Sequence, residues 1–549
     1  MLSDNNSNVP WEREETVSHV VAFEAAQYEG QSQRAFAMAC GVPRTTLQHW
    51  LSRKQSLDSS PALVKFFESP EGLAFVHRLV IAIQFVITFI VGAGIRPVME
   101  VIRLSGLEPF VANSVYSRHK LSSQLEEQTL SFEGQQREQL SKKMPTKRIT
   151  ACEDETFHPE ICLVAIEPVS NFILLEQYVE QRDAKTWNAA FGQAIEGLPI
   201  EVIQSTSDEG KGVVSHVKQG LGAHHSPDLF HVQQELSRAT SVALAGQVKR
   251  AEKAQAEAAT QRAAVERQVI EGKPKGGLNL EARITQAQDN EEKAAQTLDI
   301  ARGRQERAHQ AISGIGQVYH PVDLKTGAWR ETAQLTEELE QHFAEIKTVA
   351  EQAELSERCR KGIDKAHRVV PAMEDTMTFF HREVEEQVDA LELSTQQATA
   401  VKQHLVPAAY LDRAASKATP ADTRPELRDL AAQLRADSEQ SLVGLNAEQR
   451  PLVERVVQDC ADLFQRSSSC VEGRNGQLAL RHHSLHRISA TRLAALTVVH
   501  NYFIKRPDGT TAAQRFFEAK PDDLFTWLLD HTDMPARPAK KRSVHAQLN

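Results

Sequence analysis

The spacing of apolar residues between positions 147 and 232 indicates a segment that mixes strands with helices. Its first three apolar runs are short and closely connected, which is typical of antiparallel strands. The next run, from Asp183 to Glu196, has apolar residues at helical intervals behind an aspartate cap. A crossover helix after the third strand would place the fourth strand beside the first. The predicted elements are, in order, strands at 147–153, 161–167 and 172–179, a helix at 183–196, a strand at 200–206, a helix at 212–221 and a last strand at 229–232.

Residues 32–54 have the pattern of two short helices joined by a tight turn. Phe36 faces inward from the first helix, and Gly41 suits the turn. Leu47 and Trp50 of the second helix face back to the same core. An ordinary two-helix corner has the same pattern, so that interpretation stays open. The outward positions are those that a recognition helix presents to the major groove of DNA, namely Arg44, Thr45, Gln48 and His49.

One uncharged segment, Leu79 to Ile95, has the composition of a membrane span. It is short for the roughly 20 residues that a spanning helix needs, and it contains Gln84, Gly92 and Gly94. No anchoring belt of aromatic residues and no second span accompany it. We therefore expect a buried helix and no contact with a membrane.

Strand patterns stop near residue 233, and helical patterns continue to residue 467. Within this block, residues 242–313 are rich in Ala, Glu, Gln, Lys and Arg and contain few large apolar residues. The sequence GKPKGG at 272–277 divides them, which predicts a long antiparallel helical hairpin. A mixed segment follows at 468–534, and a basic tail at 535–549.

Length and charge set broad limits on the class of protein. A chain of 549 residues exceeds a single core, so about two to four domains are expected. The net charge of −10 argues against a surface coated in basic residues, although local basic clusters remain available to bind nucleic acid. The six cysteines form no CxxC pair, and no signal-peptide pattern begins the chain, so we expect a reducing cytoplasm.

Three acidic residues occupy positions from which side chains can converge. Asp154 and Asp208 each end a predicted strand, and Glu472 opens a predicted helix. Carboxylates gathered in this way bind hard divalent cations, because Mg²⁺ and Mn²⁺ prefer oxygen ligands. The alternatives are that the aspartates are turn or cap residues and that Glu472 only favours the helix dipole. Glu454 and Asp459 are the other candidates for the third acid, although they look like surface positions.

Short runs around the three acids occur in a recognisable order. They are Asp154-Glu155-Thr156, Ser207-Asp208-Glu209-Gly210, Asp228-Leu229-Phe230-His231, Glu472-Gly473-Arg474-Asn475, and Arg506 to Ala512 near the end. In this order they resemble the RNase H-like catalytic domain of DDE transposases from bacterial insertion sequences. The resemblance covers about a third of the chain. Families of this kind that carry a helical insertion before the glutamate account for the long separation of Asp208 from Glu472.

The resemblance implies a fold, a reaction and partners. The implied fold is an α/β RNase H-like core with a mixed five-stranded sheet, interrupted by a large all-α insertion and preceded by an all-α helix-turn-helix domain. The implied activity is metal-dependent cleavage and transfer of DNA strands, with two Mg²⁺ or Mn²⁺ ions held by the Asp154, Asp208 and Glu472 triad. The partners would be transposon ends and target DNA, bound by a homo-oligomer of at least two chains in a bacterial cytoplasm. The expected domains are a flexible N-terminus at 1–30, a helix-turn-helix region at 31–140, core parts at 147–232 and 468–534, an insertion at 233–467 and a tail at 535–549.

Further side chains are candidates for contact with DNA. His231 or Arg474 could contact the scissile phosphate, and Asn475 could orient that phosphate or Glu472. Arg481 and Arg487 lie just beyond and could follow the DNA backbone. Trp329 of the insertion could stack on a flipped base, with a packed core tryptophan as the alternative.

Two other functional classes remain open from the sequence. A helix-turn-helix regulator or a decayed transposase would bind DNA without cutting it. A coiled-coil scaffold, suggested by the polar hairpin at 242–313, would be rod-like and would not bind DNA. Cleavage of DNA and its loss on changing Asp154 to Asn would distinguish the transposase from both.

Overall fold

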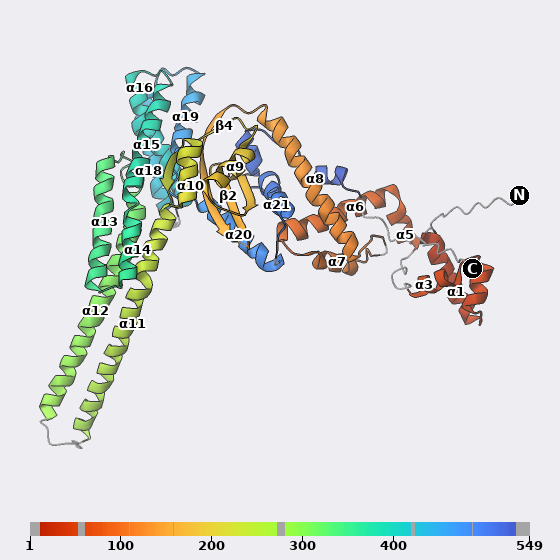
Figure 1. Cartoon of the computed structure of the whole chain (residues 1–549), viewed down its shortest axis with the longest axis horizontal. Helices are drawn as coiled ribbons and strands as arrows, with labels where there is room; N and C mark the ends of the chain where they lie inside the picture. The colour runs from red at the N-terminus through yellow and green to blue at the C-terminus, as the bar shows by residue number, and fades with distance from the viewer. Residues whose placement is uncertain are drawn as a thin grey trace. The chain divides into compact units, whose positions relative to one another are not determined.

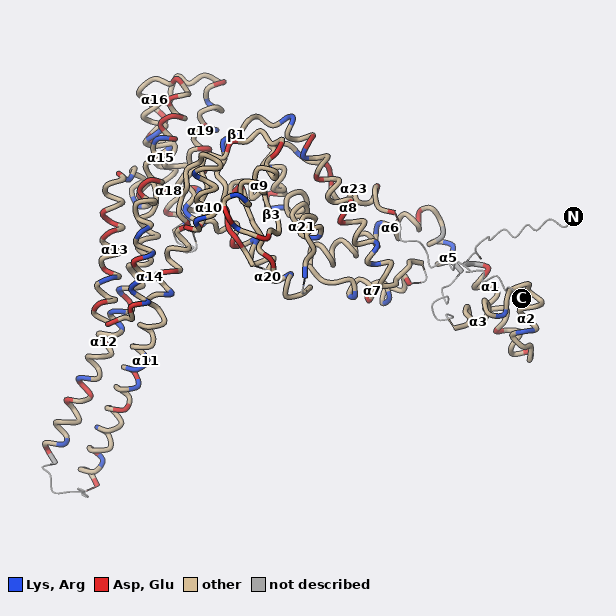
Figure 2. Tube along the Cα trace, viewed as in Figure 1, with Lys and Arg blue, Asp and Glu red and all other residues tan. Residues whose placement is uncertain are grey.

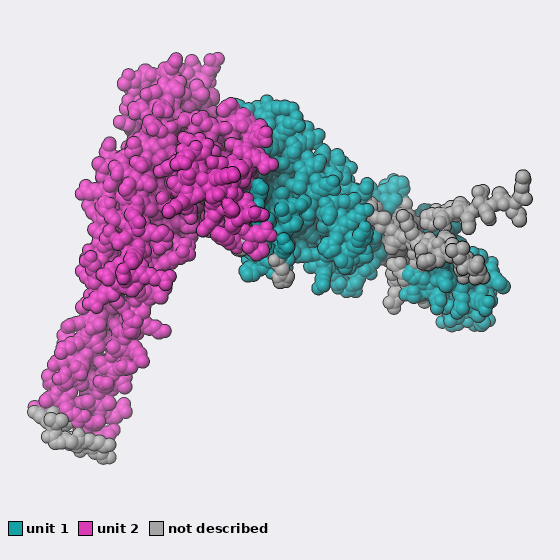
Figure 3. All heavy atoms as spheres, in the orientation of Figure 1, with its two compact units in different colours: residues 1–145, 176–178, 475–549 teal, residues 146–175, 179–474 magenta. Residues whose placement is uncertain are grey.

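The computed structural model divides the chain into two compact units (Figure 3). The first unit holds residues 1–145, 176–178 and 475–549, and the second holds residues 146–175 and 179–474. The structure describes residues 11, 13–52, 61–108, 110–157, 159–271, 280–418, 423–485 and 487–533. The expected turn at 272–277 and the expected tail at 535–549 lie outside these residues.

Helices near the start of the first unit form a small core of their own. They are α1 (Arg13–Tyr28), α2 (Gln33–Ala39) and α3 (Arg44–Ser52). Gly41 takes a φ of +64° in the turn between α2 and α3, a conformation that glycine adopts without strain. Trp50 stacks on His19 of α1, with ring centroids 5.9 Å apart. The helix–turn–helix pattern is confirmed as structure, but the expectation of a flexible segment at 1–30 is wrong for α1, because Phe23 buries one face of it.

The rest of the first unit is also mostly helical where it is described. Its long helix α8 packs against α21 and α23, which come from the far end of the sequence. The bounds are α5 (Pro61–Glu68), α6 (Pro70–Phe85), the π-helix η1 (Val86–Val91), α7 (Ile95–Leu104), α8 (Val115–Ser141), α21 (Ala490–Tyr502), α22 (Ala512–Phe517) and α23 (Leu524–His531).

The apolar segment suspected as a membrane span is a core helix of this unit. Among the described residues, Pro70–Val91 has the length and composition to cross a membrane, and 39% of its most apolar window is buried. Gln84 is fully buried, and its amide donates to the hydroxyl of Ser122 at 2.7 Å. The guanidinium of Arg492 lies 3.9 Å from the ring centroid of Phe89. These contacts join the segment to other helices of the same unit, as expected for the buried helix that the sequence predicted.

A mixed five-stranded sheet forms the centre of the second unit (Figure 1). Its order is β3-β2-β1-β4-β5; β1 is antiparallel to β2 and parallel to β4, and β4 is parallel to β5. Helix α9 (Ala184–Ile195) connects β3 to β4, with the side chain of Asp183 as its cap and Trp187 buried. This arrangement confirms the predicted crossover and is consistent with an RNase H-like fold. The strands are β1 (Lys147–Phe157), β2 (Ile161–Glu167), β3 (Phe172–Val179), β4 (Ile200–Ser207) and β5 (His224–Pro227).

Two strand predictions need correction. The first strand does not end before Asp154: β1 continues to Phe157, because it stays paired with β2 after its pairing with β4 has ended. The last strand is β5, whereas residues 229–232 begin helix α11 (Leu229–Ile270). The carboxylate of Asp228 accepts the backbone N–H of Phe230 at 2.7 Å, which caps this helix and ends the strand.

An all-helical block follows the sheet, as predicted. Its core is continuous with the sheet, because Ile203 of β4 packs into the same apolar cluster as Leu236, Phe343 and Phe464. The predicted helix at 212–221 is α10 (Lys211–Ser215) followed by the π-helix η2 (His216–Leu221). The block consists of α11, α12 (Leu280–Val318), α13 (Thr332–Gln352), α14 (Glu357–His367), α15 (Val370–Asp389), α16 (Thr395–Ala400), η3 (Val401–Leu405), α17 (Val406–Lys417), α18 (Thr423–Ser438), η4 (Glu439–Leu442) and α19 (Gln449–Leu463).

Helices α11 and α12 pair as the predicted hairpin (Figure 1). Figure 2 shows basic and acidic residues alternating along both helices. A small apolar cluster that includes Val248 and Leu298 joins their described residues beyond the main core. Ion pairs such as Arg262 with Glu291, at 3.0 Å, connect their more distal turns. This composition explains why the sequence pattern there is polar and rich in alanine.

Candidate metal centre

Asp154 and Asp208 occupy matching positions on neighbouring parallel strands. The pairing of β1 with β4 ends with Cys152 opposite Thr206, and each aspartate follows its own strand's last partner by two residues. Because β1 and β4 are parallel and Asp208 directly follows Ser207, the last residue of β4, this register places both residues at the same edge of the sheet. The predicted convergence of these two residues therefore follows from the strand register.

The alternation of β1 also separates Asp154 from its acidic neighbours. Glu153 is fully buried, and burial raises the pKa of its carboxyl to about 8. Glu155 accepts hydrogen bonds from the indole N–H of Trp187 at 3.1 Å and from the guanidinium of Arg182 at 3.0 Å. Both glutamates thus lie on the face of β1 opposite to Asp154.

Glu472 is brought to the site by a buried tie between distant segments. It lies in the first turn of α20 (Ser469–Leu485), as predicted from the sequence. Asp228, which is 2% exposed, accepts the backbone N–H of Ser468 at 3.0 Å and also the hydroxyl of Ser468. Since Asp228 caps α11 and Ser468 directly precedes α20, this contact fixes the starts of the two helices relative to each other.

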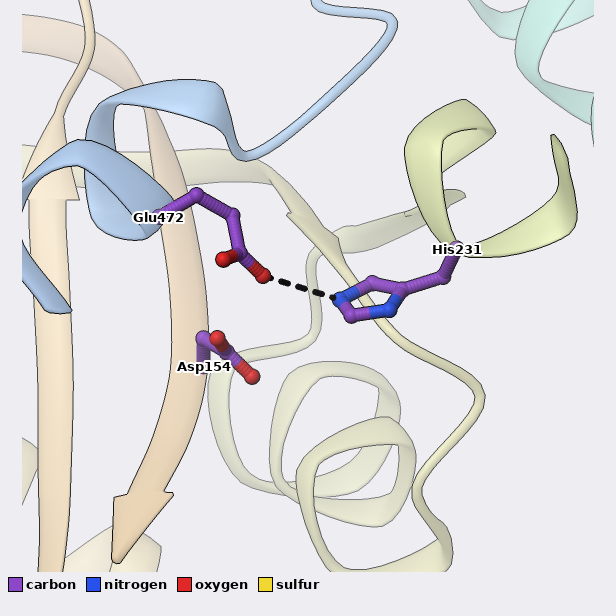
Figure 4. Close-up of side chains that lie close together, drawn as sticks. All are labelled: Asp154, His231 and Glu472. Carbon is purple, nitrogen blue, oxygen red and sulfur yellow. Dashed lines mark ion pairs between the residues drawn. The ribbon is translucent and has the colours of Figure 1, made fainter. Parts of the chain in front are cut away.

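Asp154, His231 and Glu472 form a compact group of possible metal ligands (Figure 4). One ligand atom from each lies within 4.8 Å of the others. Nε2 of His231 lies 3.6 Å from Oε1 of Glu472. All three residues are partly buried. Two carboxylates and an imidazole at this spacing suit a divalent cation.

The electrostatics of Asp154 show that both other predicted acids act on its carboxyl. Burial raises the pKa of Asp154 to about 7, and the charges of Glu472 and Asp208 add to the rise. The backbone N–H of Glu155, which donates to Oδ1 of Asp154 at 2.8 Å, and the charge of His231 oppose it. Asp208 itself accepts the backbone N–H of Gly210 at 2.9 Å and lies outside the compact group of three.

A cavity of about 380 Å³ opens beside the acids. Asp208, Asp228 and His231 line it, together with the exposed cations Arg238 of α11 and Lys365 of α14. Nζ of Lys365 lies 3.4 Å from the carboxylate of Glu235. Glu209 and Glu235 also line the cavity, so its wall carries both acids and two cations. Sequence reasoning missed Arg238 and Lys365, because they belong to helices that look like ordinary polar surface.

The remaining predicted DNA contacts are spread over both units. On α3, Arg44, Thr45 and Gln48 are exposed and His49 is half-buried. Their role in DNA binding stays a prediction. The same holds for Asn475, which is half-buried on α20, and for Arg487, which is exposed beyond the end of α20.

Three other predicted contacts have structural partners or are enclosed. Arg474 is 4% exposed. The guanidinium of Arg481 donates to the carbonyl of Phe89 in η1 at 2.8 Å. Trp329 donates its indole N–H to the carbonyl of Lys402 at 2.6 Å and packs against the helical core. Trp329 thus has the packed position that the sequence left open, and its stacking on a base stays untested.

The other candidates for the third acid, Glu454 and Asp459, are exposed on α19.

Comparison with known proteins adds one finding. A family model described as a family of unknown function (DUF6399) matches residues 401–544, a range that includes Glu472 and α20. No curated protein and no solved structure matches the chain. The match covers less than half of the chain, and its description names no activity.

Proposed function

We propose that the protein is a DNA transposase that cleaves DNA strands and transfers them to new positions, using divalent cations held by Asp154, Asp208 and Glu472. The observation that supports this most strongly is the convergence of these acids at one edge of an RNase H-like sheet, although an all-helical block separates them in the sequence. A sheet of this order with acids at this edge is compatible with enzymes that attack phosphodiesters.

The reaction needs charge to be stabilised on both the attacking and the leaving oxygen of a phosphodiester, which is the chemistry that bound divalent cations supply. Asp154 is the acid whose pKa responds to both Glu472 and Asp208, so it is the residue suited to be shared between two cations. Glu472 would be a further ligand of one cation, and Asp208 would be a further ligand of the other. The rise in the pKa of Asp154 means that cation binding must displace a proton from this carboxyl near neutral pH.

Two cations near the acids are available to a polyanionic substrate. Arg238 and Lys365 line the same cavity as Asp208, so phosphates next to the cleaved one can meet positive charge. The outward face of α3 offers a separate surface, with Arg44 and Gln48 exposed, for recognising the element ends. Because transposition joins two ends, we expect at least a dimer in the active assembly.

The test is cleavage of DNA that carries the sequences flanking the coding region, with Mg²⁺ or Mn²⁺ added. We expect nicking by the wild type and a loss of at least about 1,000-fold in Asp154→Asn, Asp208→Asn and Glu472→Gln. Glu201→Gln is the matched control, because Glu201 is an exposed acid at the opposite end of β4 from Asp208. Binding of these ends without any nicking by the wild type would instead identify a regulator that does not cut DNA.

A further inference from the structure

His231 is the nitrogen-bearing member of an otherwise acidic group. It lies in the first turn of α11, three residues after the cap Asp228, and faces Asp154 and Glu472 (Figure 4). The buried tie from Asp228 to Ser468 holds this turn against the start of α20. The imidazole is therefore positioned by the backbone of two anchored helices, as a ligand of a preorganised site requires.

The geometry at Nε2 of His231 fits a metal-ligand atom better than it fits the donor of an ion pair. Nε2 is buried and makes no hydrogen bond. It lies 3.6 Å from Glu472 and 3.9 Å from Asp228, both beyond hydrogen-bonding distance for an imidazolium donor. Ligands that share one cation with bonds of about 2.1 Å stand between about 3.0 and 4.2 Å apart, which includes the separation of Nε2 from Glu472.

Charge balance favours the same interpretation. Asp228 already accepts bonds from Phe230 and Ser468, so its carboxylate is occupied. Ionised Asp154 and Glu472 together carry two negative charges, which one divalent cation neutralises while a neutral imidazole adds a third ligand. Asp208 lies outside this group and stays available, with Asp154, for a second cation.

We propose that His231 is a metal ligand, and that a site built from Asp154, His231 and Glu472 selects Mn²⁺ over Mg²⁺. Mg²⁺ strongly prefers an all-oxygen shell and loses affinity when an oxygen ligand is replaced by nitrogen. Mn²⁺ accepts carboxylates equally well and belongs to the transition series in which imidazole adds affinity. This inference rests on the proposed function for the carboxylates but assigns a new role to the histidine.

The test measures metal binding by the full-length protein without DNA. Mn²⁺ is titrated while the electron paramagnetic resonance signal of the free ion is followed, and Mg²⁺ is then added as a competitor. We expect the wild type to bind Mn²⁺ at least about tenfold more tightly than Mg²⁺ and to show electron spin-echo modulation from one directly bound nitrogen. His231→Asn and His231→Gln should lose both the nitrogen signal and the preference, while keeping Mg²⁺ affinity within about threefold. His309→Asn, which changes an exposed histidine on α12, is the matched control and should behave as wild type.

The outcomes separate the two proposals. An unchanged Mn²⁺ preference and nitrogen signal in a folded His231 variant would show that His231 is not a ligand, while the carboxylate site would stand. Unchanged Mn²⁺ binding in Asp154→Asn would remove the metal centre itself and with it the proposed function. Loss of Mn²⁺ preference in the His231 variants, with cation binding abolished only in Asp154→Asn, supports both.

Discussion

Replacing Asp154 by Asn should stabilise the protein, and the gain should grow with pH. Burial raises the pKa of Asp154 from 3.8 to about 7 in the folded chain. Between these values the folded protein holds a proton that the unfolded chain has released, so the wild type loses stability as the pH rises. The loss is complete above pH 7, where the carboxylate is charged in both states. Asparagine carries no charge and does not incur this loss.

The magnitude follows from the size of the change in pKa. A rise from 3.8 to about 7 corresponds to about 4 kcal/mol, at about 1.4 kcal/mol for each pH unit. This is an upper limit, because Asp154 is only partly buried and solvent screens its charge. Since about 1 kcal/mol of this change falls below pH 4.5, we expect the difference in free energy of unfolding, variant minus wild type, to increase by about 2 to 3 kcal/mol between pH 4.5 and pH 8.

The assay is denaturant unfolding in EDTA at a series of pH values, followed by fluorescence. Trp187 is fully buried beside the sheet and donates to Glu155, so its emission reports on this core. Asp299→Asn, at an exposed position on α12, is the control and should give a difference that does not vary with pH. A difference between Asp154→Asn and wild type that stays constant from pH 4.5 to pH 8 would refute the reasoning, since Asp154 would then not have a raised pKa.

Three further predictions test other parts of the structure. Arg238→Ala and Lys365→Ala should each reduce the slope of log binding constant against log salt concentration by about 0.9 for duplex DNA, measured by fluorescence anisotropy; an unchanged slope would place the DNA elsewhere. Asp228→Ala should lower the free energy of unfolding by about 3 kcal/mol in a denaturant titration. The change removes a helix cap and leaves the backbone N–H of Ser468 buried without its acceptor. Ser468→Ala should lower the free energy of unfolding by only about 1 kcal/mol in the same titration. Gln48→Ala should weaken binding to the element ends by about 1 to 3 kcal/mol in a gel shift while leaving binding to unrelated DNA unchanged, and equal losses on both DNAs would argue against base recognition by α3.

Local patterns were sufficient for much of the secondary structure. The second and third strands, the aspartate cap at Asp183 and the turn at Gly41 lie where the sequence predicted them. These features depend on interactions among residues that are near neighbours in the chain, such as a side chain that caps its own helix or a glycine that permits a positive φ. The pattern at 229–232 misled because a short apolar run does not distinguish a strand from the first turn of a buried helix.

The sequence by itself identified the candidate site residues: the three acids as metal ligands and His231 as a phosphate contact, from their types and the runs around them. Only the tertiary structure decided how they meet. The register of β1 against β4 aligns Asp154 with Asp208, and the contact of Asp228 with Ser468 across the helical block sets Glu472 against His231. The cations Arg238 and Lys365 join the site for the same reason. Distances between residues far apart in the chain depend on how whole elements pack, and no local spacing encodes them.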